Sequence, residues 1–148
     1  MRIRRAGPLD LPGIYRVEKA SFPDPWPLFA FFPYFVDRDA LALVAEESGI
    51  VGFLLAFWEG KEVHIHDLAV APEHRRKGVA SALLQGLLAE AKGAQRVRLE
   101  VRASNRAAQA FYRKHGFKEA AFLPGYYADG EDGILMVRDL SEDQGPRG

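Results

Sequence analysis

Apolar and polar residues follow two different periods along the chain, and each change of period marks a change of expected secondary structure. Three apolar runs at residues 41–47, 50–58 and 62–70 are separated by turn signals at 48–49 and 59–60. Runs of this length with short breaks are typical of strands joined by tight turns. They therefore predict an antiparallel meander in the middle of the chain.

A helical period follows at residues 78–92, where Val79, Leu83 and Leu87 recur four residues apart. Residues 96–102 then alternate strictly between charged and apolar side chains. Because successive side chains of a strand point to opposite faces, this segment predicts a strand with one polar and one apolar face.

The segments near the two ends of the chain complete the pattern. They predict an opening strand at 3–5, a helix starting between Pro8 and Leu11, a helix from Ser104 or Asn105 to His115, and strands at 117–123 and 133–138. A meander followed by alternating strands and helices predicts a mixed α/β sheet.

Residues 22–35 are unusually aromatic and are interrupted by prolines. We expect one or two short helical turns whose ring faces are buried. The same rings suit an aryl-binding pocket or the face of a homodimer, so the pattern leaves these alternatives open.

The composition narrows the class of protein. The 148 residues fit one domain, expected at 1–140, followed by a disordered tail at 141–148. Twenty basic and twenty acidic residues cancel, which argues against a nucleic-acid coat, and the absence of cysteine excludes thiol chemistry. No apolar run is long enough to span a membrane and no secretory signal is visible, so a cytoplasmic location is the default.

Three cationic residues, Arg75, Arg76 and Lys77, stand directly before Gly78 at the start of the predicted helix. Unpaired N–H groups and the helix dipole make such a position suitable for a phosphate or pyrophosphate. Neither a P-loop nor a dinucleotide fingerprint is present. Taken alone, the turn is better explained as a solvated basic segment before a surface helix.

The combination of motifs narrows this choice. A strand ending LAV, a proline-containing turn, the pattern R-x-x-G-x-A and the downstream segment LEVRASNRAAQAFYRKHGF resemble the GNAT-type N-acetyltransferases. Within that superfamily the chain is most similar to bacterial ribosomal-protein-alanine N-acetyltransferases, through DPWP, LEVRASN and GYYADGEDGILM. Ala80 stands where the pattern more often has glycine.

The resemblance implies a fold of six to seven strands and four helices with splayed central strands. It also implies that acetyl-CoA lies between the strands ending at Val70 and near Val101, with its pantetheine paired to backbone like an added strand. The implied cofactor-binding residues are Leu68, Ala69, Val70, Arg75, Arg76, Lys77, Gly78, Val79, Ala80 and Asn105.

The resemblance assigns two catalytic roles. Glu100 is implied as the base that accepts the amine proton, and the alternative is an ordinary ion pair with Arg98 or Arg102. Tyr112 is implied as the acid that protonates the departing thiolate, and the alternative is an aromatic residue packed in the core.

Two histidines offer a rival base. His64 and His66 share one face of a predicted strand, but no third ligand accompanies them, so we expect no metal. The segment HIHDLAV also resembles the paired-histidine strand of arylalkylamine N-acetyltransferases, which makes His66 a candidate base. Histidines without chemistry, buried or at a sheet edge, are the remaining alternative.

The acceptor site is expected at Trp26, Tyr126 and Tyr127, the last two in a late loop with acidic residues. Those acidic groups suit a cationic amine, or they belong to a solvated turn. The sequence thus predicts direct acetyl transfer from acetyl-CoA, without a covalent enzyme intermediate, to a protein N-terminal amine. A small-molecule amine such as an arylalkylamine or polyamine is the second acceptor, and a non-catalytic acetyl-CoA-binding module is the third possibility.

Overall fold

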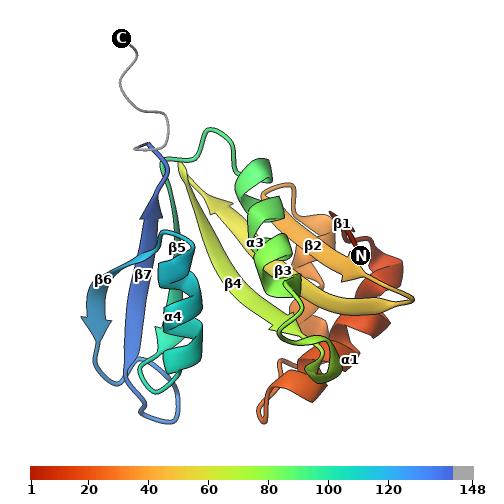
Figure 1. Ribbon diagram of the computed structural model, residues 1–148, viewed down its shortest axis with the longest axis horizontal. Coiled ribbons are helices and arrows are strands. Elements are labelled where there is room, and N and C mark those ends of the chain that lie inside the picture. The colour runs from red at the N-terminus through yellow and green to blue at the C-terminus, as the bar shows by residue number, and fades with distance from the viewer. Residues whose placement is uncertain (142–148) are drawn as a thin grey trace. The chain divides into compact units, whose positions relative to one another are not determined.

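The computed structural model describes residues 1–141, which divide into two compact units (Figure 1). Unit 1 comprises residues 1–58 and 65–92, and unit 2 comprises residues 59–64 and 93–141 of the described chain. Strand β4 contributes to both units.

Seven strands hydrogen bond in the order β1-β2-β3-β4-β5-β7-β6. They are β1 (Arg2–Arg5), β2 (Ala40–Glu46), β3 (Ile50–Glu59), β4 (Glu62–Val70), β5 (Arg96–Arg102), β6 (Lys118–Leu123) and β7 (Gly133–Asp139). The helices are α1 (Leu11–Ser21), α2 (Pro33–Val36), α3 (Val79–Glu90) and α4 (Arg106–Lys114), with short 3-10 turns η1 (Pro8–Asp10), η2 (Leu28–Phe31) and η3 (Pro72–His74). This confirms the predicted mixed α/β sheet and the expected number of strands and helices.

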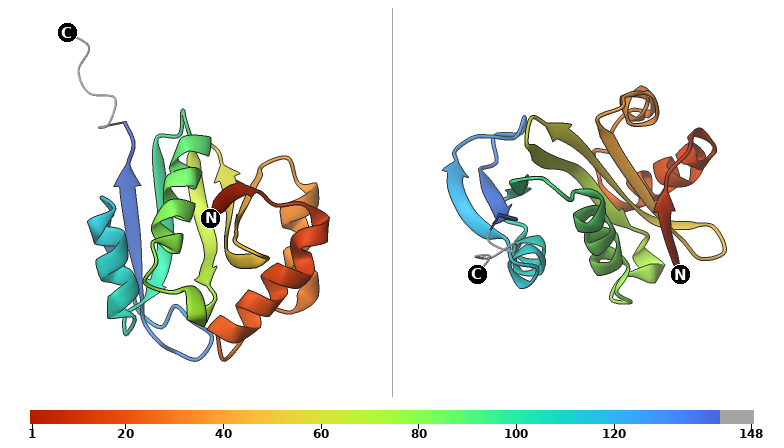
Figure 2. Two further views of the ribbon diagram at one scale, coloured as in Figure 1. Left: turned by 45° about the vertical axis from the view of Figure 1, so that its right-hand side comes forward. Right: turned by 90° about the horizontal axis from the view of Figure 1, so that it is seen from above.

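In unit 1, β1 and β3 both pair antiparallel with β2. Helix α3 covers one face of these strands, while α1 and α2 cover the other (Figure 2). Ile14 and Val17 of α1 are buried in one cluster with Ala42 and Val44 of β2. Both faces of β2 are therefore covered by helices. This explains why the strand is apolar on both faces.

Gly86 lies in the middle of α3, where glycine costs about 1 kcal/mol relative to alanine. A Cβ at this position would lie 3.1 Å from Ile3 Cγ2 and 3.4 Å from Leu43 Cδ1. The helix thus approaches β1 and β2 closely here, and a small residue suits the contact.

The aromatic segment corrects one expectation. It folds into η2 and α2 as short helical turns, and Phe31 is fully buried. Phe29 and Phe32, however, are 78% and 64% exposed, and Phe22 is 37% exposed. The prediction that the ring faces are buried is therefore wrong for these three rings, because a single turn has only one inward face.

In unit 2, β7 pairs antiparallel with both β5 and β6. Residues Glu62 to His64 of β4 run parallel to Arg96 to Arg98 of β5. Val97, Leu99 and Val101 are buried, as the strict alternation predicts.

The predicted C-terminal tail, 141–148, lies outside the described residues except for Ser141. Across residues 1–141, no helix is both long and apolar enough to cross a bilayer.

Candidate active site

The end of β4 and the turn after it, both in unit 1, carry most of the residues predicted to bind acetyl-CoA. Arg75 Nε donates a hydrogen bond of 3.0 Å to the carbonyl oxygen of Val70. One N–H group of Arg75 therefore fixes the turn to the strand end, and the side chain remains exposed.

The turn itself has an unusual backbone. Arg76 and Gly78 both adopt left-handed conformations, with φ of 64° and 82°. Arg76, Lys77 and Gly78 are exposed, whereas Val79, the first residue of α3, is buried. The turn thus presents two cationic side chains and the positive end of a twelve-residue helix to solvent, an arrangement that fits an anionic group.

Asn105 has a clear structural task. Its side-chain oxygen accepts a hydrogen bond of 3.1 Å from the Ala108 N–H and so caps α4. This capping agrees with the sequence prediction, and it leaves the amide nitrogen for any contact with the cofactor.

His66, predicted as a candidate base, lies in an aromatic cluster of unit 1. Its Nδ1 is 2.6 Å from the Tyr34 hydroxyl, and its ring stacks on Phe57 with centroids 5.6 Å apart. Tyr34 in turn stacks on Trp26, with centroids 6.0 Å apart. Trp26, predicted to bind the acceptor, therefore belongs to the same aromatic cluster as His66.

Glu100, predicted as the base, lies on the polar face of β5 in unit 2 with only 14% of its side chain exposed. Its Oε1 is 2.7 Å from Nε2 of His64, and its Oε2 is 3.5 Å from Nη1 of Arg98. The other ring nitrogen of His64 is 3.0 Å from the Glu59 carboxylate. Glu100 thus has both the ion pair that the alternative predicted and a histidine neighbour.

The surroundings of His64 act on its proton affinity in opposite directions. Burial alone would lower its pKa, but the hydrogen bond and charge of Glu100, with the hydrogen bond to Glu59, raise the pKa above its ordinary value. His64 therefore lies within hydrogen-bonding distance of two carboxylates, and this contact holds the Glu100 side chain in place.

The late loop of unit 2 brings Tyr126 to Glu100. Burial, followed by the charge of Glu100, raises the pKa of Tyr126, and the two side chains are hydrogen bonded. Burial is also the main cause that raises the pKa of Tyr127 to about 12. Both phenols therefore stay protonated near neutral pH and can act as hydrogen-bond donors.

The acidic residues of that loop are already engaged. Arg102 donates hydrogen bonds to Asp129 (2.9 Å) and Glu131 (2.8 Å), and its guanidinium lies 4.2 Å from the centre of the Tyr127 ring. Asp132 accepts from the Gly125 N–H. The loop is consequently held by hydrogen bonds, although Asp129 at its tip remains 60% exposed.

Tyr112, predicted as the acid, lies in α4 and is 8% exposed. Its ring packs edge-on against Phe111 and Phe117, with centroids 5.2 and 5.4 Å away. The ring is thus part of the core of unit 2, as the alternative predicted, which fixes its position without excluding a role for its hydroxyl.

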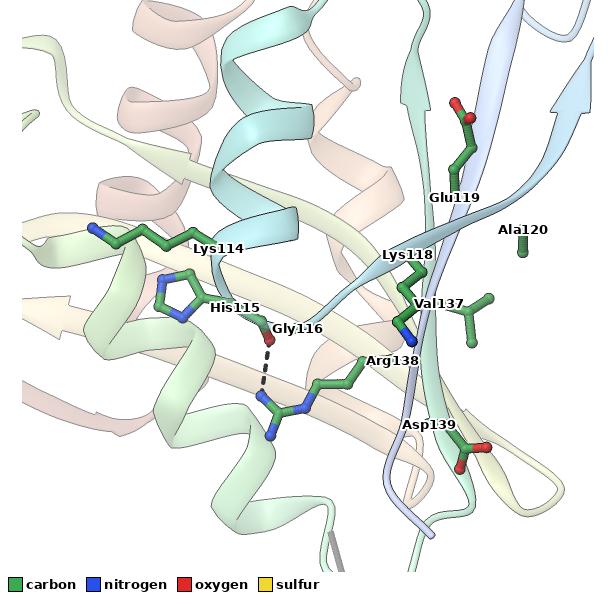
Figure 3. A pocket seen from close by; sticks show the side chains of 9 residues that line it. All are labelled: Lys114, His115, Gly116, Lys118, Glu119, Ala120, Val137, Arg138 and Asp139. Atoms are coloured by element: carbon green, nitrogen blue, oxygen red, sulfur yellow. Dashed lines mark hydrogen bonds between the residues drawn. The ribbon is translucent and has the colours of Figure 1, made fainter. Parts of the chain in front are cut away.

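A pocket of about 540 Å³ lies in unit 2 where α4 ends, β6 begins and β7 ends (Figure 3). Lys114, Lys118 and Arg138 line it, and Arg138 donates a hydrogen bond to the His115 carbonyl oxygen. None of the predicted site residues lines this pocket.

The comparison with protein families decides the class of this fold. Residues 11–117 match the model of the acetyltransferase (GNAT) family. The chain belongs to this family. It is a GNAT N-acetyltransferase, and its fold matches that of a solved member of the family.

Two relatives and one solved structure extend the match to nearly the full chain. An N-alpha-acetyltransferase of Sulfurisphaera tokodaii is 36% identical and covers 94% of this chain and 93% of its own. The ribosomal protein bS18-alanine N-acetyltransferase of Escherichia coli is 34% identical, covering 89% of this chain and 93% of its own. A crystal structure of the ribosomal-protein-S18-alanine N-acetyltransferase from Escherichia coli superposes with a TM-score of 0.86 at 32% identity, covering 93% and 92% of the two chains.

Within this N-acetyltransferase, the predicted residues divide between the units. Unit 1 holds Trp26, His66, Leu68, Ala69, Val70, Arg75, Arg76, Lys77, Gly78, Val79 and Ala80, and unit 2 holds Glu100, Asn105, Tyr112, Tyr126 and Tyr127. The structure brings Glu100 together with Tyr126, and Trp26 together with His66 through Tyr34.

Sequence reasoning missed the partner of Glu100. It selected His66 as the histidine base, whereas the structure places His64 against Glu100. The two residues are 36 positions apart and meet because His64 lies opposite Arg98 in the parallel register of β4 and β5. The pattern of apolar and polar residues in either strand does not reveal this register.

Proposed function

We propose that this enzyme transfers the acetyl group of acetyl-CoA to the α-amine of a protein N-terminus. The observation that carries the proposal is the match along nearly the whole chain to enzymes named for acetylating N-terminal amines. The site residues add support because suitable groups are present to take the proton of the amine and to protonate the departing thiolate.

The cofactor side is assigned to unit 1. The backbone of Leu68 to Val70 offers a strand end for the pantetheine amides, and the turn from Arg75 to Ala80 offers cations and helix N–H groups for the pyrophosphate. The left-handed backbone of Arg76 and Gly78 supports this assignment, because it directs successive N–H groups of a turn outward.

The two proton transfers, from the acceptor amine and to the departing thiolate, are assigned to residues of unit 2. At pH 7 an α-amine with a pKa near 7.8 is about 10–15% neutral, whereas a lysine is only about 0.04% neutral. A carboxylate is sufficient to take the proton of such an amine as its nitrogen attacks the acetyl carbonyl carbon. Glu100 accepts that proton, and the hydrogen bond from His64 orients the carboxylate.

The leaving group needs a proton when the C–S bond of the tetrahedral intermediate breaks. The Tyr112 phenol donates it to the thiolate sulfur, so that the products are the N-acetylated amine and free CoA thiol. The amine proton held by Glu100 and the proton lost by Tyr112 then balance through solvent, and no covalent enzyme intermediate is involved.

A small-molecule acceptor is the second candidate, and one observation favours it. Trp26, Tyr34, Phe57 and His66 form a continuous group of rings to which an arylalkylamine could bind. In that reaction His66, held by the Tyr34 hydroxyl, would take the amine proton.

The test is thiol release from acetyl-CoA with three acceptors in parallel. They are a ribosomal-type peptide with a free N-terminal alanine, the same peptide blocked at its N-terminus but carrying a lysine, and an arylalkylamine. We expect turnover of the free-terminus peptide and its loss in Glu100→Gln. Turnover of the arylalkylamine alone, lost in His66→Ala, would overturn the proposal. Tight acetyl-CoA binding without any turnover would instead indicate the non-catalytic module.

Several expectations from the sequence stay predictions. They are the cytoplasmic location, the single domain over residues 1–140, the homodimer, and a reaction that needs no metal, nucleic acid or membrane.

A further inference from the structure

Two carboxyl side chains meet in the interior of unit 1, outside the residues assigned to the reaction. Glu18 belongs to the last turns of α1 and is 1% exposed, and Asp67 belongs to β4. Glu18 Oε1 and Asp67 Oδ2 are both shielded from solvent, and within residues 1–141 neither receives a hydrogen bond from an N–H or O–H group.

Two ionised carboxylates cannot satisfy each other, since both only accept hydrogen bonds. One proton between them satisfies both oxygens and removes one of the two buried charges. Burial, followed by the hydrogen bond and the charge of Glu18, raises the pKa of Asp67 to about 9. At neutral pH the pair therefore holds one proton.

No cation of the neighbouring elements compensates this pair. Arg16 of α1 donates to the Ile50 carbonyl oxygen at 2.9 Å, and Lys19 lies 5.3 Å from the centre of the Tyr15 ring. His66, the neighbour of Asp67 in β4, is bonded to Tyr34. The groups that act on the Asp67 carboxyl are Glu18 and the Leu68 N–H.

The second oxygen of Glu18 reaches a different part of the unit. Glu18 Oε2 accepts a hydrogen bond of 2.9 Å from the Trp26 N–H. The Trp26 ring packs on Phe31, with centroids 5.5 Å apart, and on Tyr34. Glu18 thus connects the proline-rich segment that carries Trp26 with the strand that carries Asp67.

We infer that Glu18 and Asp67 share one proton and that this carboxyl pair positions the acceptor-binding segment around Trp26 against β4. Asp67 directly precedes Leu68 to Val70 in β4, so the same pair also fixes the position of the strand end assigned to the pantetheine. The positioning of the acceptor rests on the proposed function, whereas the sharing of a proton does not. Loss of the proton leaves two facing carboxylates, whose repulsion displaces the segment.

The shared proton is tested by the fluorescence of Trp26 as a function of pH. Trp26 and Trp58 are the two tryptophans of the chain, so a Trp58→Phe background isolates the signal. We expect an alkaline transition in this background that disappears in Asp67→Asn and in Glu18→Gln, because an amide donates the same hydrogen bond without titrating. An unchanged transition in both amide variants would overturn the shared proton.

The positioning role is tested by kinetics that compare amide and alanine variants. Removing a hydrogen bond to a buried charged group corresponds to about a tenfold to hundredfold effect. We therefore expect Asp67→Ala and Glu18→Ala to raise the KM for the acceptor peptide by that factor with little change in kcat, and Asp67→Asn and Glu18→Gln to restore it. Equal effects of amide and alanine, or an effect on kcat alone, would overturn positioning.

Two controls keep the tests separate. Circular dichroism checks that the alanine variants fold, and the amide variants still decide the matter through their fluorescence if the alanine variants do not. If the unmodified enzyme acetylates no peptide, the proposed function and the acceptor role are wrong together, and the fluorescence titration alone then decides whether the two carboxyls share a proton.

Discussion

Two histidines two residues apart in β4 have different environments. His64 lies in unit 2 between the carboxylates of Glu59 and Glu100; burial alone would lower its pKa, but the hydrogen bond and charge of Glu100 raise it. His66 lies in unit 1 beside Tyr34 and Phe57, and its Nδ1 is 2.6 Å from the Tyr34 hydroxyl. The charged network of unit 2 suits proton transfer, whereas the aromatic cluster of unit 1 suits binding. Two residues that share one face of a strand therefore do not necessarily share the same neighbours.

The largest expected effect comes from removing the carboxylate of unit 2. Glu100→Gln keeps the shape of the side chain but loses the base, so kcat should fall by about a hundredfold to ten-thousandfold. Steady-state thiol release with the free-terminus peptide measures this. Glu62→Gln is the matched control because Glu62 pairs with Arg96 and Arg98 on the same sheet. Similar losses in both variants would assign the effect to the ion-pair network and not to a base.

The next comparison sets the two histidines against each other. His64→Ala removes the hydrogen bond that orients Glu100, so kcat should fall by about tenfold or more with a peptide acceptor. His66→Ala should act mainly on the KM of the acceptor. The two variants are assayed side by side across pH with peptide and arylalkylamine. If His66→Ala lowered kcat with the arylalkylamine more than His64→Ala did, the proton-transfer role would belong to His66 in unit 1 and not to the charged residues of unit 2.

Much of this arrangement follows from the sequence. The strict alternation of residues 96–102 predicted both β5 and the polar face that carries Glu100, and the four-residue spacing predicted α3. Burial in the segment 22–35 was predicted poorly, since prolines interrupt any period that would mark an inward face.

Contacts that join distant strands and helices were also beyond the sequence. The His64–Glu100 contact depends on the register of two parallel strands, and the Glu18–Asp67 contact depends on how α1 packs on β4. Neither registers nor packing angles change the local pattern of apolar residues, so both contacts needed the structure.

The buried carboxyl pair of unit 1 makes a prediction about stability. The folded-state pKa of Asp67, about 9, exceeds the unfolded value near 3.9, so the folded state holds one more proton between these limits. Its stabilising contribution is therefore complete below pH 4 and is lost as pH rises towards 9. The unfolding equilibrium constant should rise by up to about tenfold per pH unit from this pair.

Asp67→Asn should remove that slope. Urea unfolding at a series of pH values between 5 and 9 measures it, with the exposed Asp24→Asn as control. Parallel stability curves for Asp67→Asn and the unmodified enzyme would show that Asp67 is ionised throughout.

The smallest expected effect concerns the anion-binding turn of unit 1. Gly78 has φ of 82°, and a Cβ there would meet no protein atom within 4 Å. Gly93, with φ of 93°, is open in the same way but lies in unit 2 and is assigned no ligand. Alanine at either position is strained by about 1 kcal/mol or more. The two substitutions should therefore lower the free energy of unfolding by similar amounts. They differ only in whether a ligand contacts the glycine.

If the pyrophosphate of acetyl-CoA contacts the backbone at this turn, Gly78→Ala should raise the KM for acetyl-CoA about fivefold, while Gly93→Ala leaves it unchanged. Equal KM values in the two variants would mean that the basic turn binds no phosphate, and the cofactor contacts of unit 1 would then be confined to the end of β4.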